Sequence, residues 1–363
     1  MKVKPPLFSL PSRYEFQHEI LKGGQGSVYV CRDRNLDRLV AIKALHDVSD
    51  PTALTKEING RALIKSKHVA ELYDCILDPV NAAPLALVLE YVPGVSLADQ
   101  AQHPAGVEHA VRILYQICSG VADIHAAGVI HRDIKPLNMK FDAAGVLKIF
   151  DLGIANLDAS SAHTVGGAGT YVFRAPELYG TPPIKVTPAV DVYAVGVIVR
   201  YVLGKNYPAT LLEIPPYHSG GCVESIAIEV PELAAVAPIL DAALNPDPAE
   251  RPTAAELRDA LASFLTHAQR RAIFSSETGV FELKKLGYAT RIEIKPYGTL
   301  RVAYSQDGRF IIREVEGAIF VNNVPAVVGQ ELPNSCVLTF GAAGAAWQRK
   351  FVPFDVSQPE IVL

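Results

Sequence analysis

The sequence predicts an α+β protein in which a small β-rich lobe and a larger helical lobe precede a small all-β sandwich domain. Three observations support this prediction. Short β-type runs separated by turn residues fill the first 90 residues, and helical patterns with a period of three to four residues dominate the middle of the chain. From residue 280 onward, apolar and polar residues alternate between frequent turns.

Composition limits the classes of protein to be considered. The chain has 363 residues, of which 49% are hydrophobic and 20% charged, as is typical of globular proteins with more than one core. A net charge of −4 with scattered basic residues predicts no nucleic-acid partner. The longest apolar run, at residues 192–199, is far shorter than the about 20 residues of a membrane span. With no signal-peptide core and no closely spaced cysteines, we expect a cytoplasmic protein without zinc sites or disulfides.

The small lobe is expected to contain five strands and one helix. The helix, at residues 53–65, follows an N-cap signal at Asp50, Pro51 and Thr52. The predicted strands span residues 14–20, 27–32, 39–44, 69–75 and 85–89.

In the larger lobe, a long amphipathic helix begins near residue 111 and ends at Gly128, since glycine commonly terminates helices. Further helices are predicted at residues 191–203, 232–244 and 254–267. The polar residues 268–279 suggest a linker, and residues 280–363 a β-rich domain, either a sandwich or a barrel. Its strands are expected at residues 291–294, 300–304, 310–313, 318–321 and 336–340.

A glycine-rich turn lies between the first two predicted strands. Glycines allow backbone amides to approach phosphate oxygens closely, although the same pattern also occurs in simple hairpins. Lys43 follows on the third strand, where it is either an edge residue or a buried cation that requires an anion. The turn comprises Leu21, Lys22, Gly23, Gly24, Gln25, Gly26, Ser27 and Val28.

Two short segments after the long helix carry side chains suited to chemistry. The run from His131 to Asn138 includes a proton acceptor at Asp133, a cation at Lys135 and an amide that can bind a metal at Asn138. Asp151, followed by Leu152 and Gly153, comes directly after an apolar strand. An Asp-x-Gly run taken alone is most often a turn.

Together with Ala175-Pro176-Glu177, Asp191 and Arg251, these motifs resemble those of the protein kinase family in content, order and spacing. The resemblance extends from residue 14 to residue 267. It implies a two-lobed kinase domain at residues 13–267, with an N-lobe at 13–89, a hinge at 90–94 and a C-lobe at 95–267.

The resemblance also implies catalytic roles. Asp133 would accept the proton of the substrate hydroxyl, and Lys135 would neutralise charge on the γ-phosphoryl group. Lys43, held by Glu57, would orient the α- and β-phosphates of ATP. In the same family, Glu177 and Arg251 form a structural ion pair and Asp191 anchors the catalytic loop.

ATP and Mg²⁺ are the implied cofactors, with Mn²⁺ as a possible substitute. The metal would be held by Asn138 and Asp151. Besides the glycine-rich turn, the residues expected around the nucleotide are Ala41, Lys43, the gatekeeper Leu89, and the hinge residues Glu90 and Val92.

The position of Lys135, two residues after Asp133, resembles serine/threonine kinases, here of the bacterial type, that signal by phosphorylating proteins and themselves. Arg132 suggests an activation loop that becomes ordered when it is phosphorylated. The candidate phosphorylation sites are Ser160, Ser161, Thr164 and Thr170, among which we favour Thr164.

Several positions depart from the kinase pattern. Leu21 replaces the first glycine of the turn, and Gln25 occupies the place of a common aromatic. Arg61 stands where an apolar residue is usual, Phe173 replaces a common tyrosine, and Asn59 is an alternative to Glu57. These departures leave open a pseudokinase scaffold that acts as a binding module. A small-molecule kinase is disfavoured by Ala175-Pro176-Glu177 and by the long loop at residues 154–174.

The C-terminal region resembles the latter half of a forkhead-associated domain, through residues 308–317, 320–327 and 332–341. Such domains are β-sandwiches that bind phosphothreonine. Here Tyr288 follows Gly287 where the family has arginine, and residues 296–299 lie near the place of the family's Ser-Arg-x-His run. We therefore favour docking of a protein partner or autoregulation over phosphopeptide binding.

Overall fold

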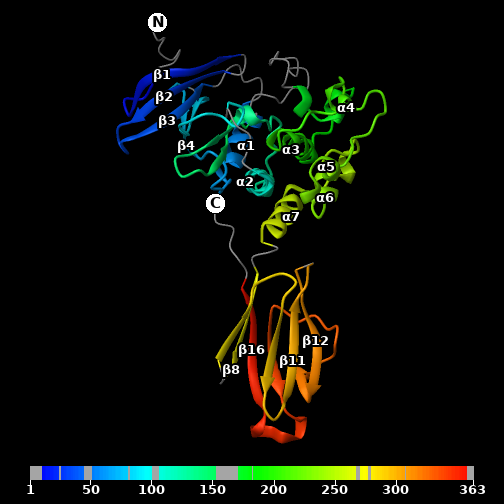
Figure 1. Cartoon of the computed structure of the whole chain (residues 1–363). Coiled ribbons are helices and arrows are strands. Elements are labelled where there is room, and N and C mark those ends of the chain that lie inside the picture. Colours follow the sequence, from blue (N-terminus) through cyan, green and yellow to red (C-terminus); the bar gives the residue numbers. More distant parts are fainter. Residues whose placement is uncertain are drawn as a thin grey trace. The chain divides into compact units, whose positions relative to one another are not determined.

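The structure, a computed structural model, describes residues 10–23, 26–44, 51–80, 82–99, 106–152, 171–181, 183–266, 270–276, 279–306 and 308–357. It divides into two compact units, one of which ends at Leu261 while the other begins at Ala262 (Figure 1). In the described part of the chain, none of the helices combines the length and apolar character required to cross a membrane.

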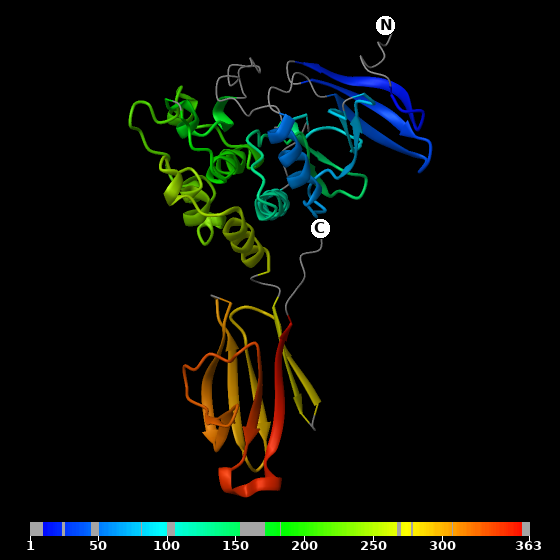
Figure 2. The ribbon, with the colours of Figure 1, turned by 180° about the vertical axis from the view of Figure 1, so that it is seen from behind.

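The small lobe of the first unit is a five-stranded antiparallel sheet in the order β1-β2-β3-β5-β4. All five predicted strands are confirmed, and the predicted helix is α1 (Pro51–Ala62). In both views α1 lies between this sheet and the helices of the larger lobe (Figure 2). The strands are β1 (Tyr14–Gly23), β2 (Gly26–Asp33), β3 (Arg38–Ala44), β4 (Leu72–Leu77) and β5 (Pro84–Glu90).

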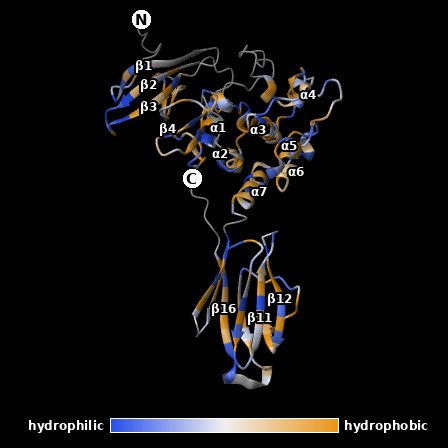
Figure 3. Cartoon of the chain, viewed as in Figure 1, coloured by the Kyte–Doolittle hydropathy of each residue, from blue (hydrophilic) through white to orange (hydrophobic). Residues whose placement is uncertain are grey.

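The larger lobe is helical, with a two-stranded ribbon of β6 (Met139–Phe141) and β7 (Leu147–Ile149). Its central helix α3 is buried along almost its whole length and is mostly apolar (Figure 3). Gly196 allows this packing, because a Cβ atom there would lie 2.9 Å from the Leu244 side chain. The helices are α2 (Val107–Ala126), α3 (Ala189–Val202), α4 (Ala209–Leu212), α5 (Ile226–Glu229), α6 (Ala237–Ala242) and α7 (Ala254–Thr266).

The single helix predicted at residues 232–244 was wrong. A 3₁₀ turn at Pro231–Leu233 precedes α6, which begins only at Ala237. Pro238 explains the break, because proline lacks the N–H group of an interior helical residue and its ring clashes with the preceding turn. Proline is well tolerated in the first turn, where it lies in α6.

The second unit consists of antiparallel strands in two sheets. The three-stranded sheet has the order β10-β11-β12, and the six-stranded sheet the order β14-β13-β15-β16-β8-β9. Side chains from both sheets belong to one hydrophobic core, in which Phe274 and Phe354 lie 4.9 Å apart between ring centroids. The strands are β8 (Arg271–Ser276), β9 (Gly279–Leu283), β10 (Ala289–Ile294), β11 (Gly298–Tyr304), β12 (Phe310–Gly317), β13 (Ile319–Val321), β14 (Val324–Pro325), β15 (Ser335–Phe340) and β16 (Lys350–Ser357).

The linker predicted at residues 268–279 was wrong in its central part, which is strand β8. This strand pairs with β16 in an antiparallel register that places Phe274 opposite Phe354. Ala272 and Phe274 point into the core while their neighbours are exposed, so the segment has the alternation of a half-buried strand. The β-rich domain therefore begins about ten residues earlier than the predicted boundary.

Candidate active site

One buried carboxylate organises the loop that contains Asp133. Asp191, at the start of α3, is 1% exposed and accepts hydrogen bonds from the backbone N–H groups of His131 and Arg132, both at 2.8 Å. Its Oδ2 atom also lies 2.9 Å from Nε2 of His125 on α2. Arg132 has a φ of 66°, a conformation that L-residues adopt only at a cost. The bonds to Asp191 hold the loop in this strained conformation.

His131 connects this loop to the segment that leads to Asp151. Its ring is fully buried, with Nε2 3.1 Å from the carbonyl oxygen of Phe150 and Nδ1 3.3 Å from the backbone nitrogen of Asp133. Burial lowers the pKa of His131 because the charged form loses its hydration. A neutral ring that donates from Nε2 and accepts at Nδ1 satisfies both contacts.

The three polar groups predicted in the loop meet at one point. The Asp133 carboxylate receives Lys135 Nζ at 2.8 Å and Asn138 Nδ2 at 2.9 Å, both at Oδ2. Asn138 also donates from Nδ2 to the backbone oxygen of Asp133. The amide nitrogen of Asn138 is therefore committed to Asp133, which leaves its Oδ1 atom to face a cation.

Asp151 and Lys43 form an ion pair between the larger lobe and strand β3. Burial alone would raise the pKa of Asp151, but the charge and hydrogen bond of Lys43 outweigh it and the net pKa is lowered. The charge of Arg61 adds to this stabilisation of the carboxylate. Asp151 is thus an ionised carboxylate with a φ of 61°. The side chain of Glu57, the predicted partner of Lys43, lies outside the described side chains, although its helix α1 is in place.

The residues predicted around a nucleotide occupy neighbouring strands. Ala41 on β3 and Leu89 on β5 are direct partners in the sheet and share a cluster with Ile58 of α1. Val92, just beyond β5, is buried. The glycine-rich turn connects β1 and β2, with Leu21, Lys22 and Gly23 on β1 and Gly26, Ser27 and Val28 on β2. Gly24 and Gln25 lie outside the described residues, as do Ser160, Ser161, Thr164 and Thr170.

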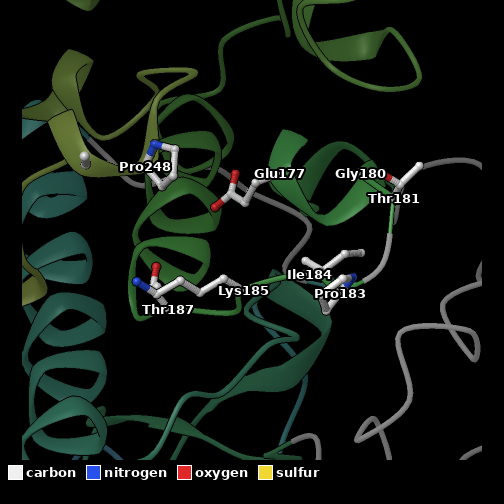
Figure 4. Close-up of a pocket in the computed structure, with 9 residues that line it drawn as sticks. Glu177, Gly180, Thr181, Pro183, Ile184, Lys185, Thr187 and Pro248 are labelled. Carbon is white, nitrogen blue, oxygen red and sulfur yellow. The ribbon is translucent and has the colours of Figure 1, made fainter.

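Glu177 and Arg251 form a bidentate ion pair, with two N–O distances of 2.8 Å. The Arg251 side chain is fully buried, donates to three backbone carbonyls and lies 5.1 Å from the centre of the Tyr193 ring. Beside this pair is a cavity of about 430 Å³, lined by Glu177, Lys185 and Pro248 among others (Figure 4). Neither Asp133 nor Asp151 lines this cavity, so it is separate from the candidate site.

Sequence reasoning missed two contributors. His125 lies on the long helix and was not singled out, although a histidine on a buried stripe is itself a signal for a polar partner. Lys148 was overlooked within a short apolar strand, yet its Nζ lies 3.0 Å from the Glu90 carboxylate. A charged residue inside such a run is costly to bury and therefore predicts a counter-ion.

Similar proteins include several kinases. "Serine/threonine-protein kinases drp72" of Corynebacterium efficiens is 37% identical over 208 residues, covering 54% of this chain and 40% of that protein. "Probable serine/threonine-protein kinase pknA2" of Bifidobacterium longum is 31% identical over 220 residues, covering 57% of this chain and 28% of that protein. "Serine/threonine-protein kinase PknB" of Mycobacterium tuberculosis is 30% identical over 213 residues, covering 55% and 34%.

The chain spans less than half the length of these curated relatives. Residues 14–261 match the model of the protein kinase domain, which is most of the chain and nearly the whole of the first unit. The match contains every residue of the candidate site described above. The chain therefore belongs to the protein kinase family.

Proposed function

We propose that this chain is a serine/threonine protein kinase that transfers the γ-phosphoryl group of ATP to proteins, including itself. The observation that carries the proposal is the convergence of Lys135 and Asn138 on the Asp133 carboxylate. The ion pair of Lys43 with Asp151 supplies the remaining side chains proposed to act on ATP. Together they offer a proton acceptor, two cations and two oxygen ligands, and Asp191 holds the loop that contains Asp133 in place.

Asp133 orients the substrate hydroxyl and accepts its proton as the oxygen attacks phosphorus. Lys135, held against Asp133 before the reaction, is positioned to neutralise charge on the transferred group. Lys43 is 7% exposed and is drawn to the α- and β-phosphates when nucleotide binds, assisted by Glu57. The bond from Asn138 Nδ2 keeps the Asp133 carboxylate aimed at the hydroxyl.

Asn138 Oδ1 and the Asp151 carboxylate are hard oxygen ligands that suit Mg²⁺, and Mn²⁺ accepts the same set. A metal ion held by these two residues would supply positive charge to neutralise the phosphates. The lowered pKa of Asp151 keeps this ligand ionised at neutral pH. The ion pair of Asp151 with Lys43 supports the assignment of Asp151 as a metal ligand, because a carboxylate that already faces one cation can bind a metal ion in its place.

Further features belong to the same proposal. The nucleotide lies against the glycine-rich turn, Ala41, Leu89 and the hinge at Glu90 and Val92. Phosphorylation of the activation loop, with Thr164 as the favoured residue, activates a cytoplasmic kinase of bacterial type. The kinase domain occupies residues 13–267.

For the C-terminal unit we propose a β-sandwich of the forkhead-associated type that docks a protein partner or regulates the kinase. Two antiparallel sheets around one apolar core support the architecture. The arginine that binds phosphate in that family is replaced by Tyr288, whose ring lies 4.5 Å from Lys285 Nζ. This difference favours docking without a phosphate group.

The test is autophosphorylation with labelled ATP and Mg²⁺, comparing the wild-type chain with Asp133→Ala and mapping the modified residues. Loss of a general base lowers such rates by about 10²- to 10⁴-fold, so labelling on serine or threonine should nearly vanish. Nucleotide binding should persist in the variant, because Asp133 faces the hydroxyl. A wild-type chain that neither incorporates phosphate nor binds nucleotide would instead be a scaffold.

A further inference from the structure

Outside the residues assigned to catalysis, one ion pair connects the end of the small sheet with the larger lobe. Glu90 ends β5, and its carboxylate receives Lys148 Nζ at 3.0 Å and the backbone N–H of Glu71 at 3.2 Å. Lys148 lies on β7, three residues before Asp151. The side chains of Lys148 and Glu90 are 13% and 21% exposed, so most of the pair is withdrawn from solvent.

The backbone around this ion pair makes the same connections. Glu90 N–H donates to the Glu71 carbonyl at 2.8 Å. Ala70 N–H donates to the Ile149 carbonyl, and Ile149 N–H to the His68 carbonyl, both at 2.8 Å. The segment at residues 68–71 is therefore bonded on one side to the hinge strand and on the other to β7. The Glu90–Lys148 pair closes this arrangement by joining the hinge strand to β7 directly.

We propose that Lys148 and the Glu90 carboxylate are positioning residues that hold the hinge backbone in register with the strand leading to Asp151, and thereby set the affinity for nucleotide. The inference rests on the proposed function, in which adenine meets the hinge backbone and Asp151 faces the phosphates. One bound nucleotide must contact both places, so their relative position determines how well it fits. Neither side chain touches the reacting atoms, so the effect is on binding.

The burial of the pair distinguishes it from an ordinary surface ion pair. Exposed pairs contribute little because water and salt screen them. Here the carboxylate also accepts a backbone N–H, so removing Lys148 leaves a mostly buried anion without its cation. The hinge strand must then shift to hydrate that anion, which moves the backbone that binds adenine.

The experiment titrates the full chain with a fluorescent ATP analogue and Mg²⁺, and measures steady-state kinetics with ATP as the varied substrate. Lys148→Met should raise the Kd for nucleotide about three- to tenfold while kcat stays within about twofold. Lys148→Arg should restore the Kd, because it keeps the cation. Lys140→Met is the matched control: Lys140 lies directly opposite Lys148 in the β6–β7 ribbon, and this change should leave the Kd near the wild-type value.

Glu90→Gln, alone and combined with Lys148→Met, tests whether the two side chains act as one unit. The double variant should bind nucleotide no more weakly than the weaker single variant. A Lys148→Met chain that binds as tightly as the wild type overturns the inference. So does an unchanged Kd with a higher kcat, which would mean that the pair restrains catalysis. Failure of the wild-type chain to bind the nucleotide contradicts the proposed function and this inference with it.

Discussion

The helical lobe and the C-terminal β unit are stabilised in different ways. In the lobe, two charged groups are buried and extensively hydrogen-bonded: Arg251 pairs with Glu177, and Asp191 accepts two backbone N–H groups. In the β unit, the ion pairs between sheet segments are long and join mostly exposed side chains. Three of them have N–O distances of 3.7 Å: Arg271–Glu282, Arg291–Glu316 and Arg309–Glu331.

The difference reflects what each region must hold in place. A loop in a strained backbone conformation, such as the one at Arg132, has no regular ladder of its own and needs buried side-chain acceptors. Paired strands satisfy their own backbone groups, so the β unit requires only an apolar core. Buried charge therefore marks the region where geometry matters for chemistry.

The largest expected effect comes from Arg251→Met in the lobe. This change removes the cation from a buried pair and leaves Glu177 and three carbonyl acceptors without their donor, at a cost of about 3–5 kcal/mol in the free energy of unfolding. Urea unfolding followed by circular dichroism at 222 nm, which reports the helices, measures it. A loss below about 1 kcal/mol would show that the pair is dispensable and would weaken the comparison.

Phe354→Ala should lower the free energy of unfolding of the β unit, where Phe354 is fully buried against Phe274 and Phe310. Truncating a buried phenylalanine costs about 3–5 kcal/mol, which includes the cavity that it leaves. The only tryptophan of the chain, Trp347, belongs to this unit and reports its unfolding by fluorescence. The circular dichroism transition of the helices should stay at an unchanged urea concentration. If both transitions shift together, the two units do not unfold independently.

The stability of the two regions should depend differently on pH, and this comparison requires no mutation. Burial lowers the pKa of His68 and His131, so in each case the unfolded state binds a proton more readily than the folded state. Stability from these residues is complete above the unfolded pKa of about 6.5 and is lost below it, by at most about 1.4 kcal/mol per pH unit for each histidine.

The β unit contains no histidine from β8 onward, since His267 is the last in the chain and precedes that strand. Between pH 7.5 and 5.5 the helical transition should therefore move to lower urea, while the Trp347 transition should remain nearly constant. His68→Gln should flatten part of the pH dependence of the helical transition. Equal pH dependence of both transitions would contradict this explanation.

The smallest effect is expected from Arg309→Gln in the β unit. Its ion pair with Glu331 joins side chains that are both about half exposed, and such pairs contribute between about 0 and 1 kcal/mol. The Trp347 transition should shift by no more than this, and 0.5 M salt should remove most of the shift. A loss comparable to that of Arg251→Met would mean that the β unit also depends on its charges.

Most of the candidate site was predictable because its residues are close in the chain. Asp133, Lys135 and Asn138 lie within one short loop, so their spacing alone brings them together. The strands of the small lobe and the longer helices of the kinase domain were also predictable, except at Pro238. The short elements β6, α4 and α5 were not predicted. The strand β8 was not recognised, because its partner β16 is about 80 residues away and its six residues resemble a polar connection.

Local order along the chain was enough to specify the kinase domain, its catalytic loop and the five predicted strands of the β unit, because these follow from spacing and periodicity. The strands β8, β9, β14 and β16 were not predicted. The pair of Arg251 with Glu177 was expected from the resemblance. Tertiary structure alone decided that Lys43 is buried with Asp151 and Glu90 with Lys148. Each of these pairs joins segments that are 58 to 108 residues apart. The free energy of such a pair depends on burial and on neighbouring hydrogen bonds, which exist only once the chain has folded.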